Sequence, residues 1–254
     1  MISAGQLAPL VAEAFARHRQ GALQEAAALC RKVLAAEPAH ADANHLLGII
    51  AYQTGNARGA LDLVQRAVAA RPGSADFLGT LGVVQRAAGQ TEAAIASFRA
   101  ALRLRPGLGQ TAANLGNALA QLGRFAEAAE SYDAALRAEP GAPGVHNNLG
   151  NVLRELGRPK EAVESFRAAL RLNPAYVEAQ TNLGFTLAAM GRLEEAVASY
   201  RAALEIRPDH AAAHHNRAMP SAISAGRTMR WPATDGCSRS PPALPRPITT
   251  WRLC

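Results

Sequence analysis

Hydrophobic and polar positions alternate along the chain in a way that is typical of paired amphipathic helices. Apolar residues recur with the 3.6-residue period of a helix in stretches such as 112–122, and each such stretch ends at a glycine. A glycine in this place commonly adopts the left-handed conformation that closes the last helical turn. The following apolar stretch ends at a proline, which has no amide hydrogen and cannot continue a helix. The pattern therefore predicts a unit of helix A, a glycine turn, helix B and a proline turn.

This unit repeats with a period of 34 residues, and four columns of residues keep the same step. The prolines that follow helix B are Pro38, Pro72, Pro106, Pro140, Pro174 and Pro208. The glycines of the turn are Gly21, Gly55, Gly89, Gly123, Gly157 and Gly191. A second glycine column lies inside helix A, at Gly48, Gly82, Gly116, Gly150 and Gly184. A column in helix B reads Cys30, Val64, Phe98, Tyr132, Phe166 and Tyr200.

The glycines inside helix A indicate how the two helices pack. Glycine within a helix costs roughly 1 kcal/mol relative to alanine, so it persists where helices cross too closely for a side chain. We expect the large residue of helix B to fill the space beside this crossing. The fixed period predicts an all-α solenoid of stacked units. The six units are 7–40, 41–74, 75–108, 109–142, 143–176 and 177–210.

The repeat resembles the tetratricopeptide repeat (TPR) family. The fourth unit reads NLGNALAQLGRFAEAAESYDAALRAEP from Asn114 to Pro140, and the fifth unit, Asn148–Pro174, follows it closely. The resemblance covers residues 7–210 and implies a right-handed superhelix whose A helices line a concave groove. The first unit departs from the pattern, with Glu13 and Ala14 where later units have Leu-Gly. Such divergence is typical of a terminal unit with one side in water.

The register starts again at residue 211 and then fails. Residues 211–219 resemble the beginning of a seventh helix A, but Pro220 interrupts it. Residues 220–254 are rich in Pro, Arg, Ser and Thr and have no helical or strand period. Two explanations stay open: a disordered basic tail, or a shift of reading frame near codon 219. The second fails if no other frame of the gene continues the repeat past that codon.

The charge of the chain resides mostly in this tail. Of the formal charge of +7, residues 220–254 carry +4, from five arginines and one aspartate, and residues 1–219 carry +3. Only 5% of the residues are aromatic, so few rings are available for base stacking, and we expect no nucleic-acid partner. The chain has no long uncharged apolar stretch and no basic, apolar leader, so we expect neither a membrane span nor a secretory signal. Its three scattered cysteines fit a cytoplasmic protein.

No catalytic constellation stands out. The chain contains no GxSxG, P-loop, HExxH or GxGxxG motif, so the sequence predicts no catalytic residue and no cofactor. His214 and His215 are adjacent and would point in different directions on a helix, so no metal site is expected. Cys30 stands in the packing column and is interpreted as a core residue. Arg124, Arg158 and Arg192, which follow the turn glycines, are interpreted as solvated or as partners of helix ends.

A column of asparagines is the main candidate for function. It contains Asn114, Asn148, Asn182 and Asn216 at equivalent places in successive A helices, with Asn117 and Asn151 three residues on, on nearly the same face. Asparagine is a poor interior helix residue, so four in phase are costly unless they act. A primary amide donates and accepts, and can therefore match a peptide backbone whatever its side chains are. The column resembles the asparagine ladder of O-linked N-acetylglucosamine transferases, which holds substrate polypeptides.

The sequence leaves alternatives open. The asparagines can be solvated copies from recent duplication. If they bind a peptide, replacing Asn114, Asn148 and Asn182 by alanine should weaken binding and leave thermal stability equal or higher.

Two functions follow. The first is a protein–protein interaction scaffold that holds an extended polypeptide in the concave groove. The second is the substrate-recognition region of a TPR-containing glycosyltransferase that has lost its catalytic domain, so that the chain as encoded is not an enzyme. We also expect self-association at the C-terminal end of the solenoid when residues 211–219 are removed.

Overall fold

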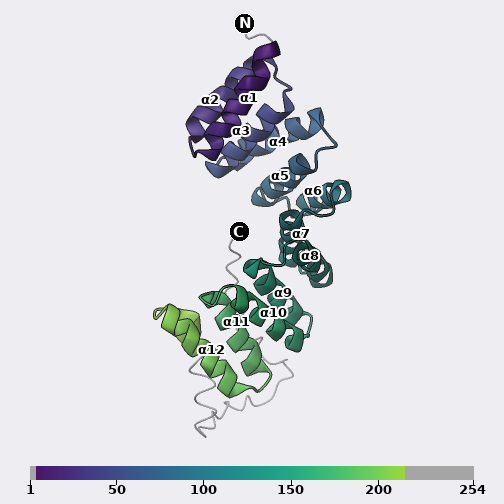
Figure 1. The fold of residues 1–254 in the computed structure, drawn as a ribbon. Helices are drawn as coiled ribbons and strands as arrows, with labels where there is room; N and C mark the ends of the chain where they lie inside the picture. The colour runs from purple at the N-terminus through teal and green to yellow at the C-terminus, as the bar shows by residue number, and fades with distance from the viewer. Residues whose placement is uncertain (1–3, 215–254) are drawn as a thin grey trace, which may run out of the picture. The chain divides into compact units, whose positions relative to one another are not determined.

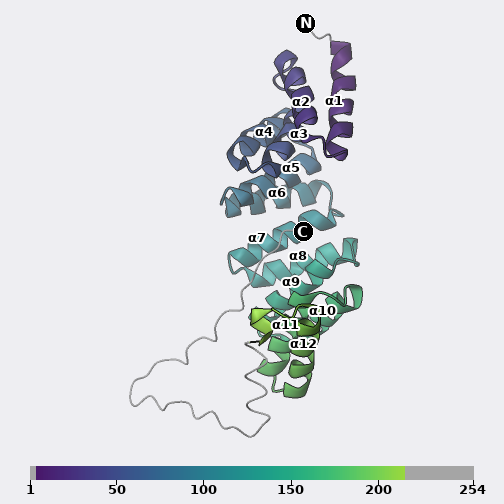
Figure 2. The same ribbon diagram turned by 90° about the vertical axis from the view of Figure 1, so that its left-hand side faces the viewer.

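The computed structural model describes residues 4–214, and these fold into helices joined by short turns (Figures 1 and 2). Twelve full helices, a short helical stretch at residues 211–214 and no strand occur in this part of the chain. Their bounds are α1 (Ala4–Arg19), α2 (Leu23–Ala36), α3 (Ala41–Gln53), α4 (Ala57–Ala70), α5 (Ala75–Ala87), α6 (Thr91–Leu104), α7 (Gly109–Gln121), α8 (Phe125–Ala138), α9 (Pro143–Glu155), α10 (Pro159–Leu172), α11 (Val177–Ala189) and α12 (Leu193–Ile206). The expected all-α solenoid fold is confirmed.

Odd-numbered helices are the A helices and even-numbered helices are the B helices of the repeat. Each A helix is followed by its turn glycine in the left-handed region, with φ between 71° and 83°. The prolines follow the B helices by two residues, as at Ala36 and Pro38. Some helix starts are capped by side chains: the backbone N–H groups of Gly59 and Phe77 donate to Asn56 and Ser74. The local signals of the sequence therefore coincide with the observed boundaries.

The glycines inside the A helices lie where helix B crosses most closely. A Cβ placed on Gly82, Gly116, Gly150 or Gly184 would come within 2.5–2.7 Å of the aromatic ring that follows in helix B. These rings are fully or almost fully buried, and Tyr132 and Phe166 have no exposed surface at all. The crossing therefore needs a hydrogen in place of a side chain, as the glycine column predicts.

The chain forms two compact units, each larger than a 34-residue repeat, and the names unit 1 and unit 2 refer to these from here on. Among the described residues, unit 1 contains helices α1–α8 and ends at Ala138, and unit 2 begins at Glu139 and contains helices α9–α12. The sequence led us to expect one continuous array over 7–210. In a repeat fold each element contacts only its neighbours, so nothing in the pattern forces a single compact body. Each unit is described below by itself.

Residues 211–214 are helical, and Ala213 is fully buried. Residues 215–219, which include Asn216, and residues 220–254 lie outside the described residues. Their predicted structure, and the reading-frame hypothesis, therefore stay predictions.

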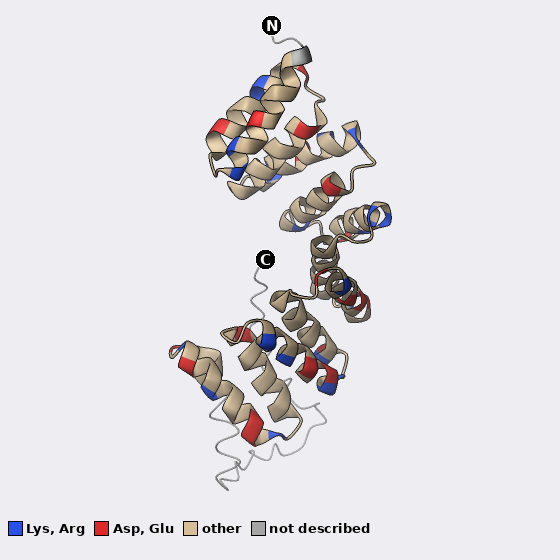
Figure 3. Cartoon of the chain, in the orientation of Figure 1, with Lys and Arg blue, Asp and Glu red and all other residues tan. Residues whose placement is uncertain are grey.

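Charged residues of both signs are spread over the B helices and the turns, and the A helices α7 and α11 carry almost none (Figure 3). Ion pairs follow the repeat: Arg71, Arg105 and Arg207 bind the acidic residue 29 positions earlier in the chain. Exposed pairs of this kind contribute little stability each. Helix α7 has no charged residue and α11 has only Glu178, so these two A helices present mainly apolar and uncharged polar groups.

Candidate functional site

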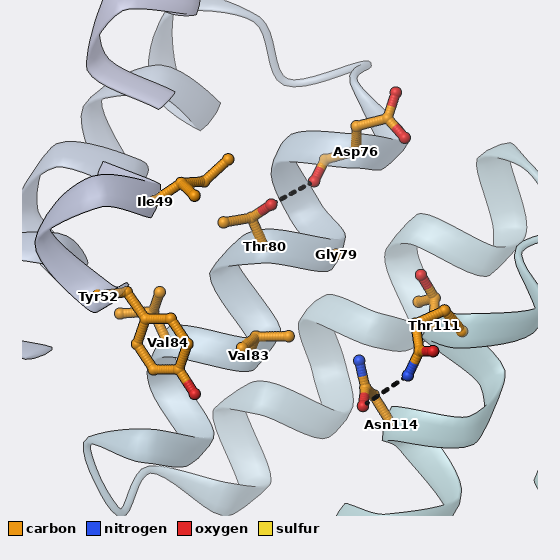
Figure 4. Close-up of a pocket in the computed structure, with 10 residues that line it drawn as sticks. Ile49, Tyr52, Asp76, Gly79, Thr80, Val83, Val84, Thr111 and Asn114 are labelled. Carbon is orange, nitrogen blue, oxygen red and sulfur yellow. Dashed lines mark hydrogen bonds between the residues drawn. The ribbon is translucent and has the colours of Figure 1, made fainter. Parts of the chain in front are cut away.

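Unit 1 has a groove whose entire lining comes from A helices (Figure 4). Its volume is about 360 Å³. Helix α3 supplies Ile49 and Tyr52, helix α5 supplies Asp76, Gly79, Thr80, Val83 and Val84, and helix α7 supplies Gln110, Thr111 and Asn114. The lining combines apolar side chains with hydroxyl, amide and carboxylate groups. This is the mixture that a polypeptide segment needs, because it offers both apolar and hydrogen-bonding partners.

The polar side chains of the groove are held in place by their neighbours. Asn114, from the predicted column, is half-buried, and its Oδ1 accepts a 3.4 Å hydrogen bond from Nε2 of Gln110 (Figure 4). Thr80 occupies the corresponding place in α5. Its hydroxyl donates to the carbonyl of Asp76 and lies 2.9 Å from Nε2 of His45 on α3. The groove therefore presents oriented polar groups.

In unit 2 the asparagines form a chain of amides across two A helices. Nδ2 of Asn182 on α11 donates to Oδ1 of Asn147 on α9 at 3.1 Å. Nδ2 of Asn147 in turn donates to Oδ1 of Asn148 at 3.5 Å. Asn148 and Asn182, both predicted, are half-buried, while Asn147 is only 6% exposed. The structure thus brings two of the predicted residues together through a third that the sequence analysis missed.

The contact between successive A helices recurs in unit 1. His45 and Thr80 are 35 residues apart, as are Asn147 and Asn182, and both pairs are hydrogen-bonded. The column of Asn182 therefore also joins one A helix to the previous one. This changes the expectation for the alanine variants. Removing the Asn182 amide should cost stability, by about 1 kcal/mol for one hydrogen bond, where the sequence suggested no loss.

Asn117 and Asn151, the other two predicted residues, have different surroundings. Oδ1 of Asn117 accepts a 2.7 Å hydrogen bond from the hydroxyl of the buried Tyr132 in helix B of the same repeat. In the next repeat Phe166 takes the place of Tyr132 and has no hydroxyl. Oδ1 of Asn151 is buried there without a partner among the described residues, and Asn151 is 8% exposed. The two residues are equivalent in register but not in bonding.

Arg154, one turn after Asn151 on α9, is a polar residue that the sequence analysis missed. Its guanidinium stacks over the ring of Phe185 on α11, with 5.2 Å from Cζ to the ring centre. Its side chain is 11% exposed, and its one ion pair in the described chain, to Glu155, measures 3.5 Å. Burial lowers the pKa of Arg154 below the usual value, because the surroundings disfavour the charged form. The residue type in the column of Arg154 varies from repeat to repeat, so the 34-residue pattern does not indicate that this arginine is special.

Other candidates have structural explanations. Arg124, Arg158 and Arg192 each bind the glutamate three residues on, with a 2.7 Å bond from Nε, which holds the start of each B helix. Cys30 is 1% exposed, and burial raises the pKa of its thiol to about 11. It therefore remains a protonated core residue at neutral pH, as its column indicated. Within residues 4–214 no cluster of three potential metal ligands is found.

The comparisons with known proteins define the class to which this fold belongs. Models of the tetratricopeptide repeat match residues 17–82, 80–143, 113–177 and 147–211. The chain belongs to the tetratricopeptide repeat family. No curated protein matches its sequence.

Solved structures show the same fold. YrrB, described as a TPR protein with an unusual peptide-binding site, aligns with a TM-score of 0.66 and 22% identity, over 74% of this chain and 97% of YrrB. MamA aligns with a TM-score of 0.59 and 23% identity, over 63% and 94% of the two chains. PilF of Pseudomonas aeruginosa aligns with a TM-score of 0.73 and 17% identity, over 84% and 97%. At these identities the likeness concerns the fold.

None of the helices described for this chain has both the length and the apolar character needed to cross a bilayer.

Proposed function

We propose that the protein is a binding scaffold whose A-helix face holds an extended segment of a partner polypeptide. The observation that carries the proposal is the groove of unit 1, since all ten residues that line it belong to A helices and none to B helices. Its apolar residues can receive side chains, and its amides and hydroxyls can bind backbone groups. The peptide-binding site named for YrrB, a protein of the same fold, supports the same interpretation.

The amides of unit 2 extend this proposal. Asn148 and Asn182 lie half-buried on successive A helices and are tied together by Asn147. A primary amide fixed by a neighbour keeps other hydrogen-bonding positions for a ligand backbone. Recognition through the backbone carries little side-chain information, so we expect many different segments to bind with moderate affinity.

A phage library of random linear peptides, panned on the immobilised full chain, tests the proposal. Peptides selected by the wild type are then titrated by fluorescence polarisation against the triple variant Asn114→Ala, Asn148→Ala, Asn182→Ala. We expect binding to weaken by about tenfold or more, because each amide contributes about 0.5–1.5 kcal/mol. Circular dichroism at the assay temperature verifies that the variant remains helical.

The matched control is Asn173→Ala. Asn173 is the exposed residue after α10, where its side chain accepts a hydrogen bond from the backbone of Ala175, and it is part of no A helix. This variant should bind the selected peptides like the wild type. Equal affinity of the triple variant and the wild type would refute the role of the amides.

The second candidate is the substrate-recognition region of a glycosyltransferase related to O-linked N-acetylglucosamine transferases. The position of Asn148 and Asn182 on adjacent A helices favours it, because a substrate polypeptide would lie along the same amides. Sequencing the gene beyond codon 219 in all frames decides the matter. A downstream frame that encodes a nucleotide-sugar-binding fold would support this function, and its absence would reject it.

A further inference from the structure

Two buried polar atoms near the end of α9 have no hydrogen-bond partner in the described chain, Oδ1 of Asn151 and Nη1 of Arg154. Native proteins pair almost all such atoms, because an unpaired one loses its bonds to water and gains nothing. Asn151 is 8% exposed, and the side chain of Arg154 is 11% exposed. Each atom therefore calls for a partner that residues 4–214 do not supply.

The surroundings of Arg154 specify an anion. Its guanidinium rests on the ring of Phe185, which contributes packing and a weak cation–π attraction but no full countercharge. Glu155 lies 3.5 Å from the other terminal nitrogen, and its side chain is 48% exposed. A cation so far removed from water needs a well-placed negative partner, and this pair is long and faces solvent. Arginine is the side chain best suited to bind a carboxylate through two parallel hydrogen bonds.

Asn151 lies close enough to Arg154 for one ligand residue to contact both side chains. Residues three apart on a helix are neighbours, roughly 5–6 Å between their Cβ atoms. This separation suits one residue of an extended peptide, whose backbone N–H can donate to Asn151 while its side-chain carboxylate accepts from Arg154. We propose that Asn151 and Arg154 form a subsite that selects an aspartate or glutamate in a segment bound to the amides of unit 2. The inference rests on the peptide-binding function proposed above and adds a side-chain preference to it.

Arg86 provides an internal comparison. It stands in α5, 68 residues before Arg154 and in the same register, and its Nε is also buried without a partner in the described chain. The residue one turn before it is Val83, so no amide accompanies Arg86. Arg86 therefore has half of the proposed subsite, and Arg86→Met is the matched control for Arg154→Met.

The test uses the full chain and the same library of random peptides. Wild-type selections should be enriched in Asp and Glu at one position relative to the unselected library. Arg154→Met keeps the apolar stem over Phe185, so it should still select peptides but lose this enrichment. A peptide with the selected acid should bind Arg154→Met about tenfold more weakly, as expected for one lost charge-assisted hydrogen bond. Arg86→Met should retain the enrichment.

A surface variant makes the test independent of the folding of the arginine variants. Glu155→Gln removes the carboxylate that competes for Arg154, so it should increase the enrichment in acids. A decrease would contradict the proposal. Wild-type selections without acids, or acids that persist in Arg154→Met, would overturn the subsite while leaving peptide binding intact. A wild-type chain that selects no peptide would overturn the proposed function, and the subsite with it.

Discussion

Asn117 and Asn151 occupy the same place in helices α7 and α9, yet only Asn117 receives a hydrogen bond from the aromatic residue of helix B. The rings of Tyr132 and Phe166 lie in the same pose against their glycines, within 2.6 Å of the missing Cβ in both repeats. A hydroxyl on Phe166 would therefore reach Asn151. We expect Phe166→Tyr to stabilise the protein by about 0.5–1.5 kcal/mol, measured by urea denaturation. It should also weaken peptide binding, because the hydroxyl occupies Oδ1 of Asn151.

Phe98→Tyr is the control for this prediction. Phe98 lies on Gly82 in the same way, but the residue at the register of Asn151 is Val83, which cannot pair with a hydroxyl. The free energy of unfolding of Phe98→Tyr should be lower than that of the wild type by about 1–3 kcal/mol, the cost of a buried unpaired polar group. If Phe166→Tyr and Phe98→Tyr change the free energy of unfolding equally, the amide of Asn151 is not the cause of the change.

The buried His45 should make the stability of unit 1 sensitive to acid. It stacks on Phe77 with 4.4 Å between ring centres and is bonded to Thr80, and burial lowers its pKa to about 4. Asp42 and Asp76 favour its protonated form and Arg71 opposes it. Between the ordinary pKa of 6.5 and about 4, the unfolded chain binds a proton that the folded chain does not. Stability should therefore fall as the pH drops through this window, by about 3 kcal/mol.

Urea denaturation from pH 7 to pH 4 measures this effect against His45→Gln. Glutamine can still bond Thr80 but does not titrate, so its stability should decline less steeply in the same window. Parallel curves for the two proteins would mean that other groups cause the acid sensitivity.

At the residue scale the sequence predicted the column of amides but not their bonds. Asn114, Asn148 and Asn182 are spaced by 34 residues, so the repeat pattern alone is enough to identify them. Asn147 has no counterpart in its column, and Arg154 shares its register only with Arg86, so the pattern marks neither; their contacts with α11 distinguish them. Three residues are close to one helical turn, so the sequence predicts Asn117 on nearly the same face as Asn114. The two side chains still differ in direction, because three residues fall short of a full turn, and this difference brings Asn117 to Tyr132.

At the scale of one helix pair, the two glycine columns are required for different reasons. Gly150 has an ordinary helical backbone, and a Cβ there would meet the ring of Phe166 at 2.6 Å. Gly157 has open space around its missing Cβ but a φ of 71°. We expect Gly150→Ala to destabilise by about 1–3 kcal/mol through overpacking, in spite of the better helix propensity of alanine. Gly157→Ala should cost about 1 kcal/mol through backbone strain.

A double-mutant cycle separates these causes. Phe166→Leu removes the ring, so Gly150→Ala should cost much less in its presence, whereas the cost of Gly157→Ala should not change. Gly157→Asn should be milder than Gly157→Ala, because asparagine tolerates the left-handed region. Equal coupling of both glycines to Phe166 would show that the crossing does not explain the Gly150 column. Thermal melts followed by circular dichroism provide all these values.

The element scale is where the sequence predicts best. Turn glycines, prolines and buried rings are short-range signals, and each is repeated often enough to fix the boundaries of the helices. The whole molecule is harder, because the same period continues through the boundary between Ala138 and Glu139. The division into two compact units depends on which helices contact each other, and a regular pattern of residues does not encode it.

At the scale of the whole molecule, each unit has its own buried rings, such as Tyr132 in unit 1 and Phe166 in unit 2. Phe166→Ala should open a cavity worth about 3–5 kcal/mol. In a repeat fold such a loss is transmitted only through neighbouring contacts. Hydrogen exchange measured by mass spectrometry should therefore accelerate in α9–α12 and stay unchanged in α1–α6. Tyr132→Ala should do the reverse, with faster exchange in unit 1 and slow exchange in α11–α12. Uniform acceleration in both variants would mean that the chain unfolds as one cooperative body, and the two compact units would then have no separate stability.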